Sequence, residues 1–108
     1  MPRVYVVNYI GHDISPVNAV VPDAEIVHLS EGNVNIFATD RTLHDFKLKM
    51  LGSTADDYLL LSGSIALNIV AFGIMLQKHC GVNLLLWHAR MGQYMPRKIT
   101  IEDLVNRG

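Results

Sequence analysis

A stretch of twenty residues without a charge, from Tyr58 to Gln77, limits what this chain can fold into. Its length meets the rule for a helix that spans a membrane. However, Ser62-Gly63-Ser64 interrupts the stretch after four residues, and the apolar segment that remains, 65–76, is too short to span alone. Membrane spans are commonly flanked by tryptophan or by basic residues, and neither a tryptophan nor a basic cluster flanks this segment. We therefore predict a strand, a turn and a helix, and no membrane partner.

The whole chain alternates between strand-like and helix-like segments. Residues 3–9 are β-branched and aromatic, which is typical of a buried strand. Leu43, Phe46 and Met50 recur at helical spacing, which indicates an amphipathic helix. We predict strands over 3–9, 24–30, 57–63, 82–88 and 94–99, helices over 39–51, 65–79 and 101–106, and one helical turn at 16–20.

Several residues are expected to start or end these helices. Ser15 is the predicted cap of the turn at 16–20, and Thr39 or Asp40 is the predicted cap of the 39–51 helix. Gly52 is expected to end that helix, and the 65–79 helix is expected to stop near Cys80-Gly81. Thr100 and the acid three residues later resemble a capping box at the start of the last helix.

Continuous apolar strands that alternate with helices indicate a mostly parallel sheet covered by helices. Pro96 lies in the last strand, and proline cannot donate to a strand ladder, so this strand is expected at an edge. We predict one α/β domain over residues 1–108. It is a small Rossmann-like three-layer sandwich with strand order 2-1-3-4 and a short antiparallel edge strand.

Composition excludes several classes of partner. The net charge is -1, whereas proteins that bind nucleic-acid polymers usually show a basic excess. A lone cysteine, Cys80, cannot form an intrachain disulfide or a cysteine-based zinc site, which fits a reducing, cytoplasmic setting. The segment "MPRVYVVNY" does not resemble a signal peptide. The five histidines are scattered over different segments, so we predict neither a metal nor a cofactor.

The 65–79 helix is apolar on two sides. Ile65, Ile69, Phe72 and Leu76 share one stripe, and Leu67, Val70 and Ile74 form another on nearly the opposite side. A helix that covers a sheet needs only one apolar face, so a partner chain is expected on the other. We predict a homodimer through this helix. The alternative is that the terminal helix or residues 17–22 cover the second stripe.

Small or polar residues follow the end of each predicted strand, whereas the strand bodies are mostly apolar. In open α/β sheets, ligands bind beyond the carboxyl ends of the strands, so we expect these residues to lie together. Arg90 would add a positive charge that clamps a phosphate, and Tyr9 or Trp87 would stack on a base unless they only pack. The candidate ligand-binding residues are Asn8, His12, Asp13, Ser30, Glu31, Ser62, Gly63, Ser64, Asn68 and Arg90.

The turn Ser62-Gly63-Ser64 has two interpretations. Free N–H groups at a helix start, together with a glycine and hydroxyls, suit an anion. Alternatively, Ser64 only caps the helix and Gly63 only makes the turn. No lysine nearby completes a phosphate loop, and no G-x-G-x-x-G is present.

The order of strand, Gly/Ser turn, helix and dimer broadly resembles Rossmann-like domains that sense or sequester small nucleotides. The dimeric ligand-sensing domains of bacterial defence systems are among these. The resemblance is one of pattern, and no family motif matches residue by residue, so no site residue is assigned from it.

Three functions stay open. The first is a module that binds or sequesters a small phosphate-bearing ligand such as a nucleotide. The second is a small hydrolase or phosphodiesterase at the same edge, with His12 as acid or base. A nucleophilic Ser62 would need His12 or His88 as its base, with Asp13 or Glu31 orienting the imidazole, and its surroundings do not match G-x-S-x-G. The third is an assembly protein without a small ligand.

Overall fold

The computed structural model describes residues 1–105, and it contains a five-stranded sheet with the order β2-β1-β3-β4-β5. The first four strands are parallel to one another, and β5 runs antiparallel to β4. The predicted strand order 2-1-3-4 and the antiparallel direction of the edge strand are therefore confirmed. The edge strand is not short as predicted, because it has eight residues, as many as the strand that it pairs with. The strands are β1 (Arg3–Val6), β2 (Glu25–His28), β3 (Tyr58–Leu60), β4 (Gly81–His88) and β5 (Gln93–Thr100).

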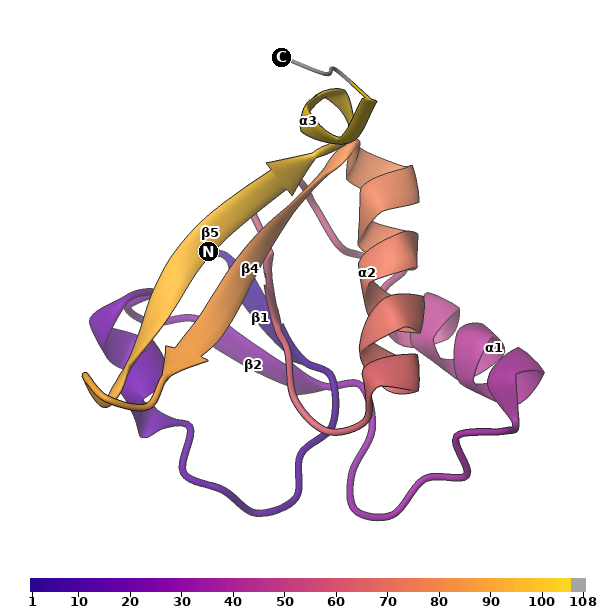
Figure 1. The fold of residues 1–108 in the computed structure, drawn as a ribbon, viewed down its shortest axis with the longest axis horizontal. Helices are drawn as coiled ribbons and strands as arrows, with labels where there is room; N and C mark the ends of the chain where they lie inside the picture. Colours follow the sequence, from indigo (N-terminus) through magenta and orange to yellow (C-terminus); the bar gives the residue numbers. More distant parts are fainter. Residues whose placement is uncertain (106–108) are drawn as a thin grey trace.

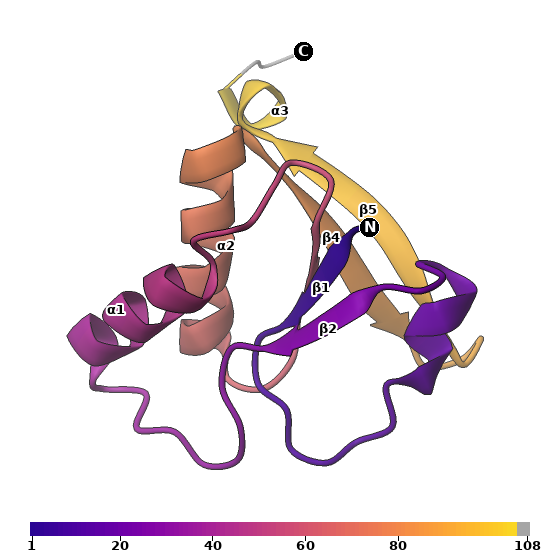
Figure 2. The same ribbon diagram turned by 180° about the vertical axis from the view of Figure 1, so that it is seen from behind.

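The helices α1 (Thr39–Lys49) and α2 (Ile65–His79) cover one face of the sheet, and the single-turn 3-10 helix η1 (Ser15–Ala19) lies on the other (Figures 1 and 2). The short helix α3 (Ile101–Val105) follows β5 at one end of the molecule (Figure 1). The predicted residue 106 of this helix lies outside the described residues. The opposite face is thus covered by one short helical turn and its loops, not by a second pair of helices.

The core is divided by the sheet into two clusters. Phe46 from α1 and Leu67 from α2 pack with Tyr5 and Leu59 on the helical face. Val17 and Val21, from η1 and the loop after it, pack with Val6 on the other face. The middle strand β1 is buried at Val4, Tyr5 and Val6, because strands pair with it on both sides and side chains cover both of its faces.

The first three strands are shorter than predicted, although their chains stay close beyond the last ladder residue. The Leu29 N–H still donates to Val6 O at 2.8 Å, and the Tyr9 N–H donates to Ser30 O at 2.8 Å. The strands β1 and β2 therefore run on side by side toward the loops that carry the candidate residues.

Three predicted helix ends are wrong. Ser15 is the first residue of η1, and its N–H donates to the Asp13 carboxylate instead of the serine capping the turn. Ala38 precedes α1 without a side-chain cap, because Asn35 already makes the turn that leads into the helix. The helix α1 ends at Lys49 rather than at Gly52.

Other predicted ends are confirmed. Ser64 caps α2 by accepting the Ala66 N–H at 3.1 Å, and Cys80 closes the helix in the left-handed conformation with φ +58°. Thr100 and Asp103 exchange two hydrogen bonds, of 3.0 and 3.3 Å, which is the expected capping box. Within the described residues, no helix is long and apolar enough to cross a membrane.

Candidate functional site

A cavity of about 410 Å³ opens at the carboxyl ends of β1, β3 and β4. The chain leaves β1 toward β2 on one side and returns to β3 on the other, so this is the point where the strand order reverses. Open α/β sheets bind ligands at such points, and the volume is within the range of small-molecule sites. Its polar lining is Asn8, His12, Asp13, Ser62 and Gly63, and its apolar lining is Ile10, Leu60, Leu61, Trp87 and Tyr94.

Hydrogen bonds hold three strand ends together beneath this cavity. The Asn8 N–H donates to the Ser62 hydroxyl at 3.1 Å. The Ser30 hydroxyl lies 2.7 Å from Val7 O and 3.2 Å from the Asn8 side-chain oxygen. Asn8, Ser30 and Ser62 therefore lie close together as predicted, and all three use a side-chain oxygen to fix the sheet edge. Ser30 does so from outside the cavity lining.

Asn68 and Ser64 hold the turn between β3 and α2. The side-chain oxygen of Asn68 accepts the Ser62 N–H at 3.0 Å, and its amide nitrogen donates to Ser62 O and Ser64 O. Ser64 caps the helix with its hydroxyl. Both side chains are thus engaged within the chain, and their contribution to a ligand is the shape of the turn.

Two kinds of hydrogen-bond donor remain for a ligand. The Asn8 side chain is 7% exposed and lines the cavity, and its amide nitrogen has no acceptor in the described part of the chain. The N–H groups of Gly63 and Ser64 at the start of α2 likewise have no acceptor within residues 1–105. Gly63 has φ +76°, and an added Cβ there would lie 2.7 Å from the Asn8 Cβ. Only glycine lets the turn approach Asn8 this closely.

The formal charge in the cavity comes from Asp13. The pKa of Asp13 lies below its ordinary value, first because its carboxylate accepts the Ser15 backbone N–H and second because it pairs with the Ser15 hydroxyl. Burial raises the pKa of Tyr94, and the negative charge of Asp13 raises it further. No lysine or arginine lines the cavity within the described residues. The Asp13 side therefore suits hydroxyl or amino groups better than phosphate.

Aromatic rings form the wall beside β4 and β5. Trp87 and Tyr94 are opposite each other in the ladder, and their ring centroids lie 4.9 Å apart in an edge-on arrangement. Trp87 is 50% exposed, so much of its indole is open to a ligand. Trp87 was weighed from the sequence, whereas Tyr94 and Ile10 were missed. The strand pairing of Tyr94 with Trp87 across the hairpin is the signal that would have found it.

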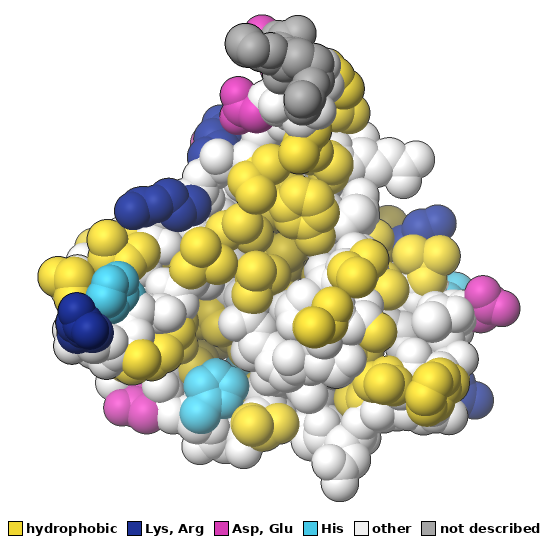
Figure 3. Space-filling view, viewed as in Figure 1, with side chains coloured by type: hydrophobic (Ala, Val, Ile, Leu, Met, Phe, Trp, Pro, Cys, Tyr) yellow, Lys and Arg dark blue, Asp and Glu magenta, His cyan; other side chains and the backbone are white. Residues whose placement is uncertain are grey.

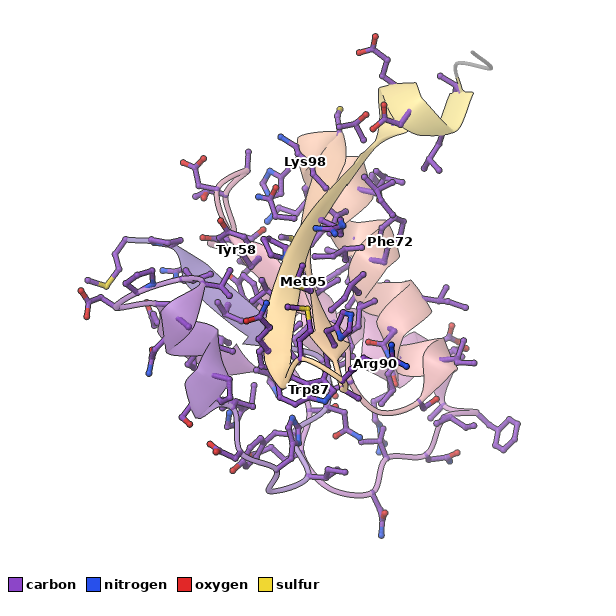
Figure 4. All side chains as sticks on the ribbon, turned by 60° about the vertical axis from the view of Figure 1, so that its left-hand side comes forward. Tyr58, Phe72, Trp87, Arg90, Met95 and Lys98 are labelled. Carbon is purple, nitrogen blue, oxygen red and sulfur yellow. The ribbon has the colours of Figure 1, made fainter. Side chains whose placement is uncertain are left out.

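Half of the ten predicted residues do not line the cavity: Ser30, Glu31, Ser64, Asn68 and Arg90. Ser30 and Glu31 line a second depression, of about 320 Å³, between the loop after β2 and helix α1. Arg90 lies in the turn between β4 and β5 and is exposed, at the same end of the hairpin as Trp87 (Figure 4). It reaches the cavity only if its long side chain turns back over the rim.

The histidines do not form a catalytic pair with Ser62. His12 stacks at a tilt with Tyr9, at a centroid distance of 5.4 Å, and His88 Nδ1 accepts the Met91 N–H. His28 stacks on Tyr9 at a centroid distance of 4.4 Å, and its Nδ1 lies 3.0 Å from the Glu31 carboxylate. The described residues also contain no group of three side chains that would hold a metal ion.

The fold and this edge define a class of protein, a mixed α/β domain with a ligand-sized cavity at the carboxyl ends of its parallel strands. Residues 2–101 match the family model described as Phage Pam3 gp32-like protein, so the chain belongs to that family. No curated protein and no solved structure matches the chain. The description of the family names no ligand, reaction or partner.

Proposed function

We propose that this protein binds or sequesters a small phosphate-bearing molecule, with a nucleotide as the best fit, and acts as a homo-oligomer. One observation carries the ligand half of this proposal. The Asn8 side-chain amide is open to the strand-end cavity and has no acceptor within residues 1–105, and it lies next to the N–H groups of Gly63 and Ser64, which have none either. Such donors favour an anionic or carbonyl oxygen, because a ligand oxygen can replace the water that these groups otherwise meet in the cavity.

We also infer that the domain is a small Rossmann-like three-layer sandwich, with η1 and its loops as the third layer. The order β2-β1-β3-β4 and the cavity where that order reverses support this inference. A reducing, cytoplasmic setting fits the free Cys80.

The charges suggest how a nucleotide would lie. Its phosphate would meet the N–H groups of Gly63 and Ser64, where the dipole of α2 is positive. Asp13 would accept a hydrogen bond from a sugar hydroxyl or a base amino group, and the Trp87 ring would contact the base. In this orientation the Asp13 carboxylate meets a hydrogen-bond donor of the ligand and not its phosphate. Arg90 would supply the cation that the lining lacks.

Trp87 is the only tryptophan in the chain, so its fluorescence reports directly on this cavity. We expect titration with mono-, di- and cyclic nucleotides to change the Trp87 emission, and calorimetry to give the same affinity for the ligand that does so. In Asn8→Ala we expect affinity for that ligand to fall at least tenfold, or about 1.4 kcal/mol, the order of one hydrogen bond to a charged group.

Arg41→Ala is the matched control, because Arg41 lines only the second depression. It should leave the titration unchanged. If no nucleotide or other phosphate-bearing compound changes the emission or releases heat, the ligand-binding proposal is wrong.

The same samples distinguish the remaining functions. Recovery of the bound compound unaltered supports sequestration, whereas its conversion to products supports the hydrolase. An assembly protein is the second candidate, favoured by the apolar outer side of α2, where Ile65 and Ile69 are exposed. A stable oligomer that binds none of the compounds would support it.

A further inference from the structure

The outer side of helix α2 is apolar although it faces away from the core. Ile65 is 79% exposed and Ile69 is 65% exposed, one turn apart on the helix. Phe72 and Leu76 continue the same stripe and are half-buried. A helix that water covers on its outer side normally carries charged residues there.

This stripe borders a groove of about 520 Å³ between α2 and the β4–β5 hairpin. Strand register places Leu86 and Met95 on the same face of the hairpin as Leu84, so the apolar surface continues toward the hairpin turn. Hydrophobic side chains form a continuous recessed strip along this line (Figure 3), with Phe72 on the helix and Met95 on the hairpin (Figure 4). We call this surface the α2 strip: Leu61, Ile65, Ile69, Phe72, Leu84, Leu86, Met95 and Ile99.

Neither of the two segments expected to cover the helix does so. Val17 and Val21, from the 17–22 segment, pack on the opposite face of the sheet. The terminal helix α3 packs mainly against β5, and Ile65 and Ile69 stay exposed. The dimer expected from the sequence therefore stays a prediction, and both of its alternatives are wrong.

Sheet extension through β5 would be another route to a dimer, and the middle of that edge is blocked. Pro96 has no N–H to donate, and its carbonyl accepts the Arg97 guanidinium at 2.6 Å. Proline and charged side chains are common ways to protect an edge strand. The β5 edge therefore does not offer a second copy an uninterrupted strand to pair with.

The size of the strip suits a second copy. At about 30 Å² per methylene, the exposed parts of Ile65, Ile69 and Leu86 present roughly 200 Å². The half-buried members of the strip bring its apolar area to on the order of 400 Å². A standard interface covers about 800 Å² on each partner, of which roughly three-fifths is apolar. The strip and its polar margin therefore approach the area that one partner contributes to such an interface.

Gly73 suggests where two copies come closest. It lies in the interior of α2, it is exposed, and an added Cβ would meet nothing within 4 Å. Glycine in a helix interior is destabilising relative to alanine, and nothing inside this chain requires it. A small residue on an apolar helix surface lets a second helix approach closely.

We propose that a second copy of this chain covers the α2 strip, with the two α2 helices packed across a two-fold axis near Gly73, which rests on the homo-oligomer of the proposed function. A strip without charged side chains is complementary to itself, and a two-fold axis brings the same surface of both copies together. Because the groove that the strip borders and the ligand cavity share Leu61, Ser62 and Gly63, the interface lies directly beside the ligand.

Light scattering coupled to size-exclusion chromatography, over a hundredfold range of protein concentration, tests this interface. We expect the wild-type chain to be a dimer and Ile69→Glu to be a monomer, because a two-fold axis places two unpaired carboxylates in an apolar contact. Leu48→Glu is the matched control, since Leu48 is 55% exposed on the outer side of α1 and should leave the dimer intact.

A second pair of variants guards against loss of folding. In a Cys80→Ser background, Ile69→Cys should be joined into a covalent dimer by a bismaleimide, and Leu48→Cys should stay monomeric. A wild-type monomer at every concentration, a dimer that persists in Ile69→Glu, or growth into open-ended oligomers would each overturn the inference. A wild-type monomer that still binds nucleotides would overturn the proposed interface and would leave the proposed ligand site unaffected.

Discussion

The two long helices α1 and α2 cover the same face of the sheet, yet their outer sides differ. The outer side of α1 carries mostly charged residues, among them Arg41, Asp45 and Lys47, with Leu48 as an exposed apolar residue beside them. The outer side of α2 carries Ile65 and Ile69. Packing against the sheet explains why the inner side of each helix is apolar, but it does not explain the composition of either outer side.

This difference separates two requirements on the same sequence. A mostly charged outer side is stable in water, so α1 needs no partner chain. An apolar outer side leaves hydrophobic side chains of α2 in contact with water, so we expect α2 to pack against a partner. Four predictions test how far the two helices are alike and where they part.

The largest expected effect tests the inner sides, which should be equivalent. Phe46 on α1 and Leu67 on α2 are both 2% exposed in one cluster. Phe46→Ala and Leu67→Ala should each lower the free energy of unfolding by about 3 kcal/mol, because each leaves a cavity in the core. Urea denaturation at a fixed protein concentration measures it. If either substitution costs less than about 1 kcal/mol, that helix does not cover the sheet as described.

The second prediction concerns the bond between the helices. The Lys78 ammonium of α2 lies 2.6 Å from Met50 O and 2.7 Å from the Ser53 hydroxyl, where α1 has just ended. Lys78→Met should lower the free energy of unfolding by about 1.5 kcal/mol, since carbonyls at a helix end lose a charged donor. Lys47→Met on α1 is the control, because Lys47 has no partner within residues 1–105. Equal effects of the two substitutions in thermal unfolding would contradict this role.

The third prediction compares the two helix starts. Ser64→Ala should destabilise the protein by about 1 kcal/mol, because the Ala66 N–H loses its acceptor. At the start of α1, Ala38 has ψ 59°, which is outside the extended geometry that a capping hydroxyl needs. Ala38→Ser should therefore change stability by less than about 0.5 kcal/mol. A larger gain from Ala38→Ser, in the same denaturation assay, would show that α1 accepts a side-chain cap after all.

The smallest expected effect concerns Gly73. In the Ile69→Glu monomer, Gly73→Ala should raise the free energy of unfolding by about 0.5 kcal/mol, because alanine favours the helix and meets no neighbour. In the wild-type dimer the gain should be smaller, since the added methyl enters the contact between the copies. An equal gain in both backgrounds, measured by thermal unfolding, would place Gly73 away from the interface.

Much of the fold was predictable because it depends on local rules. Pro96 predicted that β5 lies at an edge of the sheet. The apolar run of β3, which ends in Ser-Gly-Ser, predicted the turn from strand to helix at 62–64. Ser64 and Thr100 were recognisable as helix caps. The caps of η1 and α1 were wrong because Asp13 and Asn35 compete as turn-forming side chains just upstream. Such competition is decided by backbone geometry and not by residue type.

The candidate site was predictable only in part. Strand ends identified Asn8, Ser62 and Gly63, since parallel strands end at one edge. They could not separate Asn8, whose amide is left for a ligand, from Asn68, whose amide is used up in the turn. They also missed Tyr94, which reaches the cavity from β5 across the hairpin.

The residue pattern was enough to predict the strands, the helices and the two apolar stripes of α2, because strand and helix periods follow from local chemistry. The strand order was predictable because right-handed crossovers leave few alternatives. The packing of the whole chain was needed to show that Ser30 and Glu31 line a different depression from Asp13, and that nothing in residues 1–105 covers Ile65 and Ile69. Those outcomes depend on how the loops and the twisted β4–β5 hairpin pack in space, and contacts between distant segments leave no periodic signal in a single chain.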